Sequence, residues 1–534
     1  MDHKNARFNL GYGLITLALF GLILLSVVPA MFTGFSITST TATATNIVQT
    51  VMAQGEDPFP PSNETLTPSQ QQAREQLLNK EGFSVNVIAR NLSAPLNLLY
   101  GPDDTLWITE RVGKDILRVD PTNGTTLSKM PIPNANQSKG QDGVLGMAFD
   151  PNFNSTHYIY VAYTYEGNSG SQGEGLPELK TKITRFTYDP STNNISEPLD
   201  LINGLSGSSD HNSGRMTFGP DGNLYYTIGD QGKNQLALAC LNNMAQHLPT
   251  AEDVAAKNWS TYEGKVLRMN PDGSIPDDNP FINGVQSHIY TYGHRNAQGI
   301  AVGPTGDIYV AEHGDNSDDE LNRLVAGGNY GWPYISGYID DKAYQYYNWS
   351  AAKNCQNLKF NDVAPAPAGV TVKNESEFNA TNFVPPIQTF YTVDKGFNFT
   401  EVAKSCGEMT STCYPTVAPS SLRLYTSDTI PGWENNLLMT MLKAGKVFKI
   451  TLDDGGTAVS GDPQELFRSE NRYRDIAFSP DGSTVYVITD PAGPVQAMKE
   501  GPITPTTTLW SPGALVAIKY VGVGGGGGGN STIQ

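Results

Sequence analysis

The sequence predicts an all-β fold, a β-propeller of five to seven blades. A turn rich in Pro, Asp and Gly, followed by alternating aliphatic and aromatic residues, recurs at 101–110 (GPDDTLWITE), 149–164, 219–230, 303–315 and 479–490. A turn followed by period-two alternation indicates a hairpin, and its recurrence at irregular multiples of a blade length is typical of a propeller with loop insertions. Helical periodicity is scarce, and its best candidate is the segment 70–80.

The chain of 534 residues is expected to hold one large domain between two ends of different composition. Residues 1–32 include an uncharged apolar run from Leu10 to Phe32, which is long enough to span a bilayer and longer than the ~7–15-residue core of a usual signal peptide. An uncleaved anchor is therefore favoured over a cleaved signal, and both place the main domain outside the cytoplasm. A flexible Thr-, Ser- and Pro-rich linker (33–80), the propeller domain (81–522) and a Gly-rich flexible tail (523–534) follow.

Composition argues against two classes of function. The net charge of −18 disfavours a nucleic-acid partner, because such a partner requires a basic face. A Rossmann dehydrogenase is not expected either, because the chain has no strand–GxGxxG–helix unit followed by an acidic residue.

The four cysteines suggest an oxidising compartment. Cys406 and Cys413 flank a short loop that they are expected to close. Cys240 and Cys355 either pair or stay free. No CxxC pattern is present, so a cysteine metal site is not expected.

The segment 210–236 carries the strongest functional signal. His211 lies in a polar Gly/Ser turn, and a strand pattern then leads to Asp230 in a second glycine turn. Two such loops can direct an imidazole and a carboxylate into one pocket, and histidine is the usual general base at neutral pH. The words YGHRNAQG (292–299) and EHGDNSDDE (312–320) add an anion clamp and a cation site. Base, clamp and cation together predict redox chemistry on an alcohol with an anionic cofactor.

These motifs resemble, in the same order, motifs of the soluble glucose dehydrogenases that use pyrroloquinoline quinone. The resemblance continues through the segments 263–281, 327–333 (GGNYGWP), 406–421 and 471–482. The resemblance covers about residues 80–522 and implies a six-bladed propeller. It implies oxidation of the anomeric carbon of glucose or a related aldose to a lactone, with electrons passed on to a quinone, cytochrome or dye. It also implies a homodimer, although the sequence itself leaves the oligomeric state open.

The resemblance assigns roles to the residues of segment 210–236 and to the clamp. His211 would take the proton from the anomeric hydroxyl, and Asp230 would orient His211 and favour its protonated form. Arg295 would stabilise negative charge on the quinone oxygen. The positions that match substrate contacts are Gln141, Asp210 and Tyr414, the last of which can stack on a sugar face.

A quinone with three carboxylates requires several cations, and arginine binds carboxylates bidentately. Arg472 and Arg474 alternate in NRYRD, so on a strand they would share one face. The positions that match cofactor contacts in the family are Gln235, Leu236, Arg295, Asn296, Thr416, Lys443, Arg472 and Arg474.

Hard oxygen donors gather in the segment 314–320 and suit calcium, although the spacing of an EF-hand is absent. By resemblance, the carbonyl oxygens of Gly314 and Asp315 hold a calcium ion that polarises the quinone, with Asp319 in the same shell. A second, structural calcium is expected at Glu320, Tyr330, Ser336, Tyr338, Asp340 and Glu375, in part through backbone carbonyls.

Four positions depart from the family pattern: His313 replaces a Gln, Asp315 a Pro, Ser411 a Tyr and Tyr414 a Trp. None of them is the expected base or part of the main clamp. Because Ser411 and Tyr414 border the expected substrate mouth, we expect retained chemistry, a more open pocket and an altered substrate preference.

Two other functional classes fit a propeller. A calcium-dependent hydrolase such as a lactonase is permitted because propellers host many activities, but a lactonase needs no Arg/Lys clamp. In a non-catalytic extracellular scaffold, we would expect several of the polar residues of the candidate site to be replaced. That set is present here, as His211, Asp230, Arg295, Lys443, Arg472 and Arg474.

Overall fold

A computed structural model describes residues 82–138, 140–171, 177–361, 365–379, 381–406, 410–497 and 504–522. The expected anchor or signal, the linker with its 70–80 helix, and the Gly-rich tail lie outside these residues. Among the helices of the described residues, none has the length and apolar character needed to cross a bilayer.

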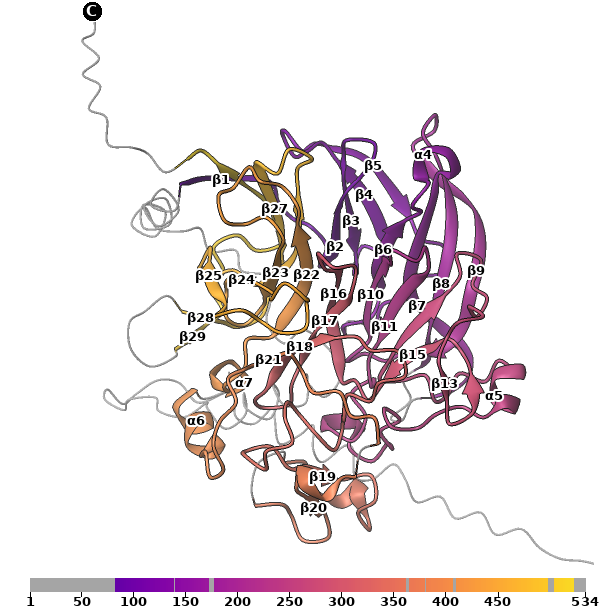
Figure 1. The fold of residues 1–534 in the computed structure, drawn as a ribbon, viewed down its shortest axis with the longest axis vertical. Coiled ribbons are helices and arrows are strands. Elements are labelled where there is room, and N and C mark those ends of the chain that lie inside the picture. The colour runs from indigo at the N-terminus through magenta and orange to yellow at the C-terminus, as the bar shows by residue number, and fades with distance from the viewer. Residues whose placement is uncertain are drawn as a thin grey trace, which may run out of the picture. The chain divides into compact units, whose positions relative to one another are not determined.

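Six four-stranded sheets form the blades of a β-propeller, which confirms the all-β class and the six blades (Figure 1). The first strand of each sheet in the following order lies innermost. The sheets are β2 (Pro95–Tyr100), β3 (Leu106–Glu110), β4 (Asp115–Val119), β5 (Thr126–Pro131); β6 (Val144–Phe149), β7 (Tyr158–Ser171), β8 (Pro177–Asp189), β9 (Asn194–Ser206); β10 (Ser213–Phe218), β11 (Leu224–Ile228), β12 (Lys265–Met269), β15 (Ile289–Tyr292); β16 (Asn296–Val302), β17 (Ile308–His313), β18 (Asp319–Arg323), β21 (Gln388–Phe390); β22 (Pro419–Tyr425), β23 (Asn436–Met441), β24 (Val447–Ile450), β25 (Gln464–Leu466); and β26 (Tyr473–Phe478), β27 (Thr484–Thr489), β30 (Leu515–Tyr520), β1 (Phe83–Ala89).

Short elements decorate the loops between these strands. Three small hairpins pair β13 (Phe281–Ile282) with β14 (Val285–Gln286), β19 (Tyr346–Asn348) with β20 (Thr371–Lys373), and β28 (Val495–Gln496) with β29 (Pro505–Thr506). The helices are α4 (Phe153–Thr156), α5 (Ala251–Ala255), α6 (Phe399–Cys406), α7 (Thr410–Cys413) and the 3₁₀ turns η1 (Leu236–Leu238), η2 (Cys355–Asn357) and η3 (Glu375–Glu377).

The recurring turn words join the two inner strands of a blade, as their pattern predicts. In three of them the glycine N–H closes the turn on a carbonyl four residues later: Gly101 to Thr105 at 2.7 Å, Gly219 to Asn223 at 2.9 Å and Gly303 to Asp307 at 2.8 Å. The inner strands β2, β6, β10, β16, β22 and β26 contact one another in a closed ring. The loops before and after these strands therefore meet at the centre of the propeller.

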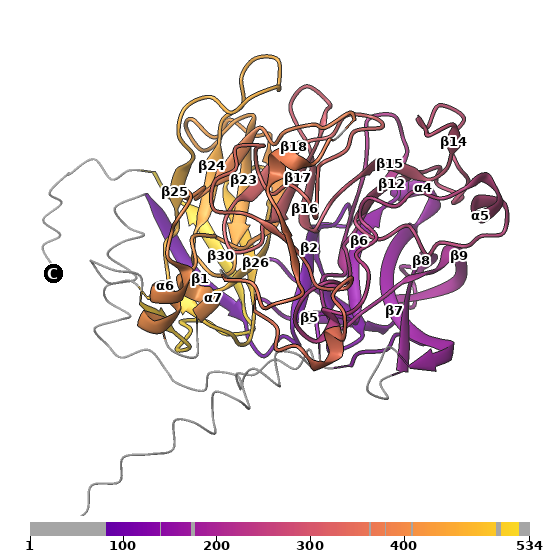
Figure 2. The ribbon, with the colours of Figure 1, turned by 90° about the horizontal axis from the view of Figure 1, so that it is seen from below.

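The ring is closed by the two ends of the described chain. Strand β1 pairs antiparallel with β30, from Phe83 opposite Tyr520 to Ala89 opposite Leu515 (Figure 2). Hydrophobic clusters fill the spaces between neighbouring sheets; in one of them Leu145 and Tyr160 of the β6 sheet pack with Tyr226 of the β10 sheet. A blade therefore buries its apolar residues only against its neighbours, so the ring must close to complete the core.

Both cysteine pairs form disulfides. The Cys406–Cys413 bridge confirms the prediction for the short loop. Cys240 and Cys355, which the sequence left open, are bonded across 115 residues with an S–S distance of 2.03 Å. This second bridge ties the segment after η1 to η2.

Candidate active site

The register of one hairpin explains why His211 and Asp230 meet. Ser213, the first residue of β10, pairs with Ile228, the last residue of β11. His211, just before β10, and Asp230, just after β11, therefore lie at the same end of this strand pair. His211 Nδ1 lies 2.8 Å from Asp230 Oδ1. The close approach depends on Gly229, because a Cβ there would lie 1.9 Å from the carbonyl oxygen of His211.

Asp230 is fully buried and accepts four hydrogen bonds. Oδ1 accepts from His211 and from the Gly232 N–H at 3.0 Å, and Oδ2 accepts from Asn243 Nδ2 at 2.9 Å and from Trp332 Nε1 at 2.7 Å. Burial alone would raise the pKa of Asp230, but His211 and the donors outweigh it and lower that pKa. An ionised carboxylate can only accept, so the hydrogen lies on His211 Nδ1 and Nε2 carries the lone pair of a base.

Two of the expected substrate residues lie beside this base. Asp210 Oδ1 accepts from Gln141 Nε2 at 2.7 Å and from the His211 N–H at 2.9 Å, and lies 3.9 Å from His211 Nε2. Tyr414, the third, is largely buried with its ring 5.4 Å from that of Phe399. The structure therefore joins Asp210 directly to His211, and Gln141 to His211 through Asp210.

Arg295, immediately before β16, lies on the other side of the base. Its Nη2 donates to Gln235 Oε1 at 3.0 Å and lies 3.4 Å from Asp315 Oδ1, and Gln235 Nε2 lies 3.3 Å from His211 Nε2. Its buried Nε has no acceptor among the described residues. The neighbouring Leu236, although apolar, leaves 46% of its surface exposed.

Lys443 is buried against the loop that carries three expected site residues. Its Nζ donates to the carbonyls of Ser411 at 3.1 Å and Tyr414 at 2.9 Å, and to Thr416 Oγ1. Burial lowers the pKa of Lys443 to about 7, against the opposing effect of Asp319. This lysine therefore fixes the 411–416 loop and titrates near neutrality.

Arg472 and Arg474 reach a single carboxylate, as expected for two residues on one face. Arg474 binds Asp490 bidentately, through Nε at 2.8 Å and Nη2 at 2.7 Å, and Arg472 Nε lies 3.5 Å from the same carboxylate. Burial would raise the pKa of Asp490, but both arginines lower it. Two guanidinium groups therefore meet at one carboxylate.

His313 shows that these cations converge. Burial and the neighbouring Arg295, His211 and Arg474 hold the pKa of His313 well below its usual range. Its Nε2 lies 2.7 Å from the Pro419 carbonyl, to which it donates. Titratable groups from three blades therefore lie close enough to act on His313. Asn296 also lies here, and its Oδ1 accepts from Ser213 Oγ at 3.1 Å.

The residues expected to hold the first calcium lie in the loop after β17. Asp319 Oδ1 accepts from the Gly314 N–H at 2.9 Å, and Oδ2 accepts from the N–H groups of Val417 and Ala418 at 2.5 and 2.8 Å. Burial raises the pKa of Asp319. The carboxylate of Asp319 thus shapes the loop that contains Gly314 and Asp315.

The second expected calcium group largely gathers around the segment 336–341. Glu320 Oε1 accepts from the Gly337 N–H at 2.6 Å, and Glu375 accepts from the N–H groups of Ser336 and Asp340 at 3.1 and 3.3 Å. Burial raises the pKa of Glu375 to about 7. The Tyr330 hydroxyl instead bonds to backbone at 323 and 325, and Tyr338 is 39% exposed.

Within the described ranges, no three His, Cys, Asp or Glu side chains are arranged to bind a metal. The family resemblance implies backbone carbonyls as ligands at the first site and, in part, at the second.

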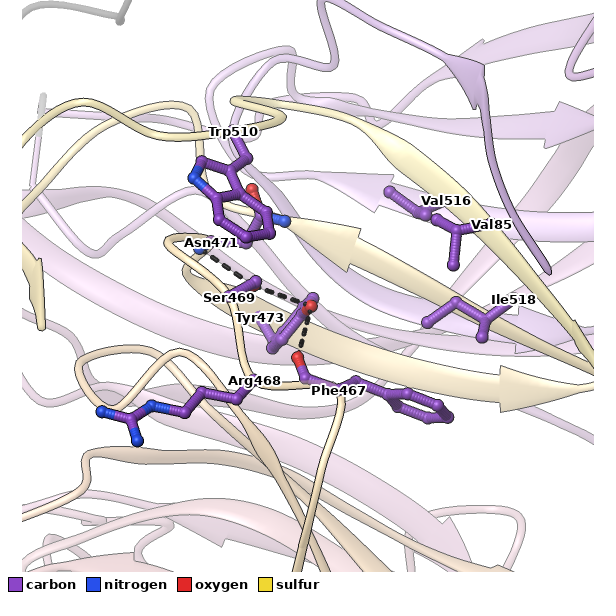
Figure 3. Close-up of a pocket in the computed structure, with 9 residues that line it drawn as sticks. All are labelled: Val85, Phe467, Arg468, Ser469, Asn471, Tyr473, Trp510, Val516 and Ile518. Carbon is purple, nitrogen blue, oxygen red and sulfur yellow. Dashed lines mark hydrogen bonds between the residues drawn. The ribbon is translucent and has the colours of Figure 1, made fainter. Parts of the chain in front are cut away.

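Two cavities differ in what they can hold. One of 270 Å³ lies beside Asp315, between the segments 342–347 and 395–400. The other, of 10 Å³ and lined by Ser469, Tyr473 and Trp510, lies in the sheet that contains β1, away from His211 (Figure 3). The smaller cavity is too small for more than one water molecule.

Sequence reasoning missed three residues that contact the site. Trp332 and Asn243 donate to Asp230, and Asp490 binds the two arginines. Trp332 lies in the word GGNYGWP, but only the family resemblance marked that word as important. Residues that act through a neighbour have no spacing signal, because the loops that bring them together are distant in sequence.

Comparison with known proteins shows which family this chain resembles. The family model described as glucose/sorbosone dehydrogenase matches residues 92–384 and 391–496. Quinoprotein glucose dehydrogenase B of Acinetobacter calcoaceticus is 49% identical over 460 residues, covering 85% of this chain and 94% of the relative. An aldose sugar dehydrogenase of Escherichia coli is 26% identical over 412 residues, covering 76% and 90%.

A solved structure supports the fold. The structure of the PQQ-bound aldose sugar dehydrogenase of Streptomyces coelicolor superposes with a TM-score of 0.52 at 24% identity, covering 82% of this chain and 98% of that one. The chain belongs to the glucose/sorbosone dehydrogenase family.

Proposed function

We propose that this protein is a quinoprotein aldose dehydrogenase that oxidises the anomeric carbon of a sugar to a lactone. The observation that carries the proposal is the His211–Asp230 pair, 2.8 Å apart, placed beside the guanidinium of Arg295. A relative 49% identical over most of both chains bears the name quinoprotein glucose dehydrogenase. A hydrolase would use the base but has no need of an Arg/Lys clamp.

The residues present fit pyrroloquinoline quinone. Its carboxylates require cations, and Arg472 and Arg474 share one carboxylate while the buried Nε of Arg295 has no acceptor among the described residues. Its planar ring requires an apolar contact, which the exposed side chain of Leu236 offers. The cofactor would be held by these residues together with Gln235, Asn296, Thr416 and Lys443.

The bound quinone supplies a hydride acceptor for the anomeric carbon. His211 Nε2 takes the proton of the anomeric hydroxyl, and Asp230 stabilises the imidazolium that results. Gln141 and Asp210 hold sugar hydroxyls beside this nitrogen, and Arg295 stabilises negative charge developing opposite the base.

Calcium is part of the proposal. The carbonyls of Gly314 and Asp315, with Asp319 behind them, would hold one ion as a Lewis acid near Arg295. A second ion would stabilise the loops around Glu320 and Glu375. The ligands proposed for it are Glu320, Tyr330, Ser336, Tyr338, Asp340 and Glu375.

The domain layout and location complete the proposal. Residues 81–522 form the catalytic propeller, outside the cytoplasm, where both disulfides would be stable. Residues 1–32 either anchor it or are cleaved, 33–80 act as a linker, and 523–534 form a tail. Its partners are an aldose, an electron acceptor and a second copy in a homodimer.

The test is an absorbance titration of the purified protein with pyrroloquinoline quinone and calcium, followed by glucose. Saturable binding and sugar-dependent bleaching of the quinone would support the proposal. Binding without bleaching would direct attention to a panel of other aldoses, with Ser411 and Tyr414 as the first positions to change. Absence of binding would contradict it.

A further inference from the structure

Trp332 contacts both the base pair and the clamp. It lies in the loop between β18 and β19 and is 8% exposed. Its Nε1 donates to Asp230 Oδ2 at 2.7 Å, and the guanidinium of Arg295 lies over its ring, 5.1 Å from the centroid. One side chain thus joins the carboxylate behind His211 to the arginine on the other side of the site.

The indole is held by contacts outside the catalytic set. The backbone N–H of Trp332 donates to the Gly293 carbonyl at 3.0 Å, and the backbone carbonyl of Trp332 accepts from Gln246 Nε2 at 2.8 Å. Its ring packs against that of Tyr344, with centroids 5.8 Å apart. Because backbone contacts fix its orientation, Trp332 can act as a rigid reference for Asp230 and Arg295.

The indole N–H of Trp332 controls how well the carboxylate of Asp230 is stabilised. Oδ2 has two donors, Trp332 and Asn243, and loss of one leaves the negative charge less stabilised. A less stabilised carboxylate holds the proton on His211 more tightly, so His211 becomes a stronger base that is protonated over a wider pH range. The other charged or titratable groups that act on His211 are Asp210, Arg295 and His313.

We propose that Trp332 is a positioning residue. It fixes the Arg295 guanidinium relative to the His211–Asp230 pair and sets the basicity of His211. The catalytic part of this inference rests on the proposed function, whereas the effect on His211 does not.

Two substitutions separate the contacts. Trp332→Phe keeps an aromatic ring for Arg295 and removes the N–H. We expect kcat to fall about tenfold, the dissociation constant for the quinone to stay within about twofold, and the acidic limb of kcat/KM to move to higher pH. Trp332→Leu removes both contacts, so quinone binding should also weaken, by about fivefold or more.

Trp433→Phe is the matched control, because Trp433 is similarly buried in the cluster around Phe83 and Phe467. It should leave kcat, its pH limb and quinone binding unchanged. A Trp332→Phe enzyme with the kcat and pH limb of this control would overturn the proposal.

A second readout does not need turnover. Histidine ¹⁵N NMR of the protein without added quinone, assigned with His211→Gln, should show a higher titration midpoint for His211 in Trp332→Phe than in Trp433→Phe. This shift in a protein that fails to oxidise any aldose would retain the positioning role and reject the proposed function. If the unmodified protein oxidises an aldose but the His211 titration midpoint does not shift in Trp332→Phe, the proposed function would be retained and the positioning role rejected.

Discussion

Arg215 and Asp475 form a buried ion pair, with 2.7 Å between Nη1 and Oδ2, and all six inner strands contribute to it. Burial lowers the pKa of Arg215 to about 10, against the effect of Asp475, so the arginine stays charged at neutral pH. The pair also bonds to the Gln298 carbonyl on β16, the Ser420 carbonyl on β22, Asn97 on β2 and, through Asn97 Oδ1, the Met147 N–H on β6. A second arginine, Arg423 on β22, lies 3.4 Å from Asp475 Oδ2. The pair therefore joins the blades at the centre of the ring.

Removal of one partner should destabilise the propeller strongly. Arg215→Met removes the nearer of the two arginines that pair with the buried Asp475 and leaves only Arg423, 3.4 Å away, to offset its charge, so we expect the free energy of unfolding to fall by about 3–5 kcal/mol. Urea unfolding measures this change. Glu401→Gln, which breaks an exposed pair with Lys404, is the control and should cost less than about 1 kcal/mol. Equal losses in the two variants would show that closure does not depend on the central pair.

The blades could be predicted from sequence because their signal is local. Each turn word lies next to the strands it joins, and five of the six blades carry one. The β22–β23 connection lacks the word, since its turn reads TSDTIPGWEN (426–435). The Arg215–Asp475 contact spans 260 residues, and no spacing could have indicated it. Long-range closure depends on the number of blades, and only the family resemblance fixed that number.

His211→Gln should abolish sugar oxidation while leaving the quinone bound. The substitution keeps a polar side chain but removes the base, and loss of a general base costs about 10²–10⁴-fold in rate. Stopped-flow reduction of the bound quinone by glucose measures the chemical step. Asp230→Asn should lower the same rate through the wrong tautomer of His211. Retained turnover in His211→Gln would remove His211 as the base.

Arg295→Ala tests the clamp. The guanidinium lies beside Gln235 and over Trp332, so its loss should slow reduction of the bound quinone by about 10²-fold with little effect on unfolding. Arg268→Ala is a matched control, because Arg268 is similarly buried but pairs with Asp221 in the β10–β11 turn and Asp278 in the loop after β12. An unchanged reduction rate in Arg295→Ala would reject its electrostatic role.

The site could be predicted only in part. His211 and Asp230 follow from the hairpin register, which alternation and turns reveal. The roles of Lys443, Arg472 and Arg474 came from resemblance, because three isolated cations carry no pattern that separates a cofactor clamp from surface ion pairs. The pairing of Cys240 with Cys355 could not be derived, since it depends on how the η1 and η2 loops meet.

Quinone affinity should fall as pH rises through neutrality because of Lys443. A lysine whose pKa in the folded protein is about 7 is charged below that pH and neutral above it. A carboxylate of the cofactor favours the charged form of Lys443. Above neutrality, binding of the cofactor must therefore be accompanied by uptake of a proton by Lys443. The dissociation constant should rise by up to about tenfold per pH unit above this value. Absorbance titrations across the range measure it.

Lys443→Met should weaken binding below neutrality and remove most of this pH dependence. Lys446→Met is the control, because Lys446 is similarly buried but pairs with Glu465 instead of the 411–416 loop. Affinity that is flat with pH in the unmodified protein would show that Lys443 stays charged or does not act on the cofactor.

The Cys240–Cys355 bridge should stabilise both the fold and the cofactor loop. It closes 115 residues, and chain entropy gives a contribution of about 4–5 kcal/mol, against about 2 kcal/mol for Cys406–Cys413 with its separation of 7. Urea unfolding of the two double alanine variants compares these values. Because Cys240 follows η1, which carries Leu236, its release should also weaken quinone binding. Unchanged affinity in Cys240→Ala/Cys355→Ala would show that Gln235 and Leu236 are held by their own contacts, such as the Gln235–Arg295 hydrogen bond.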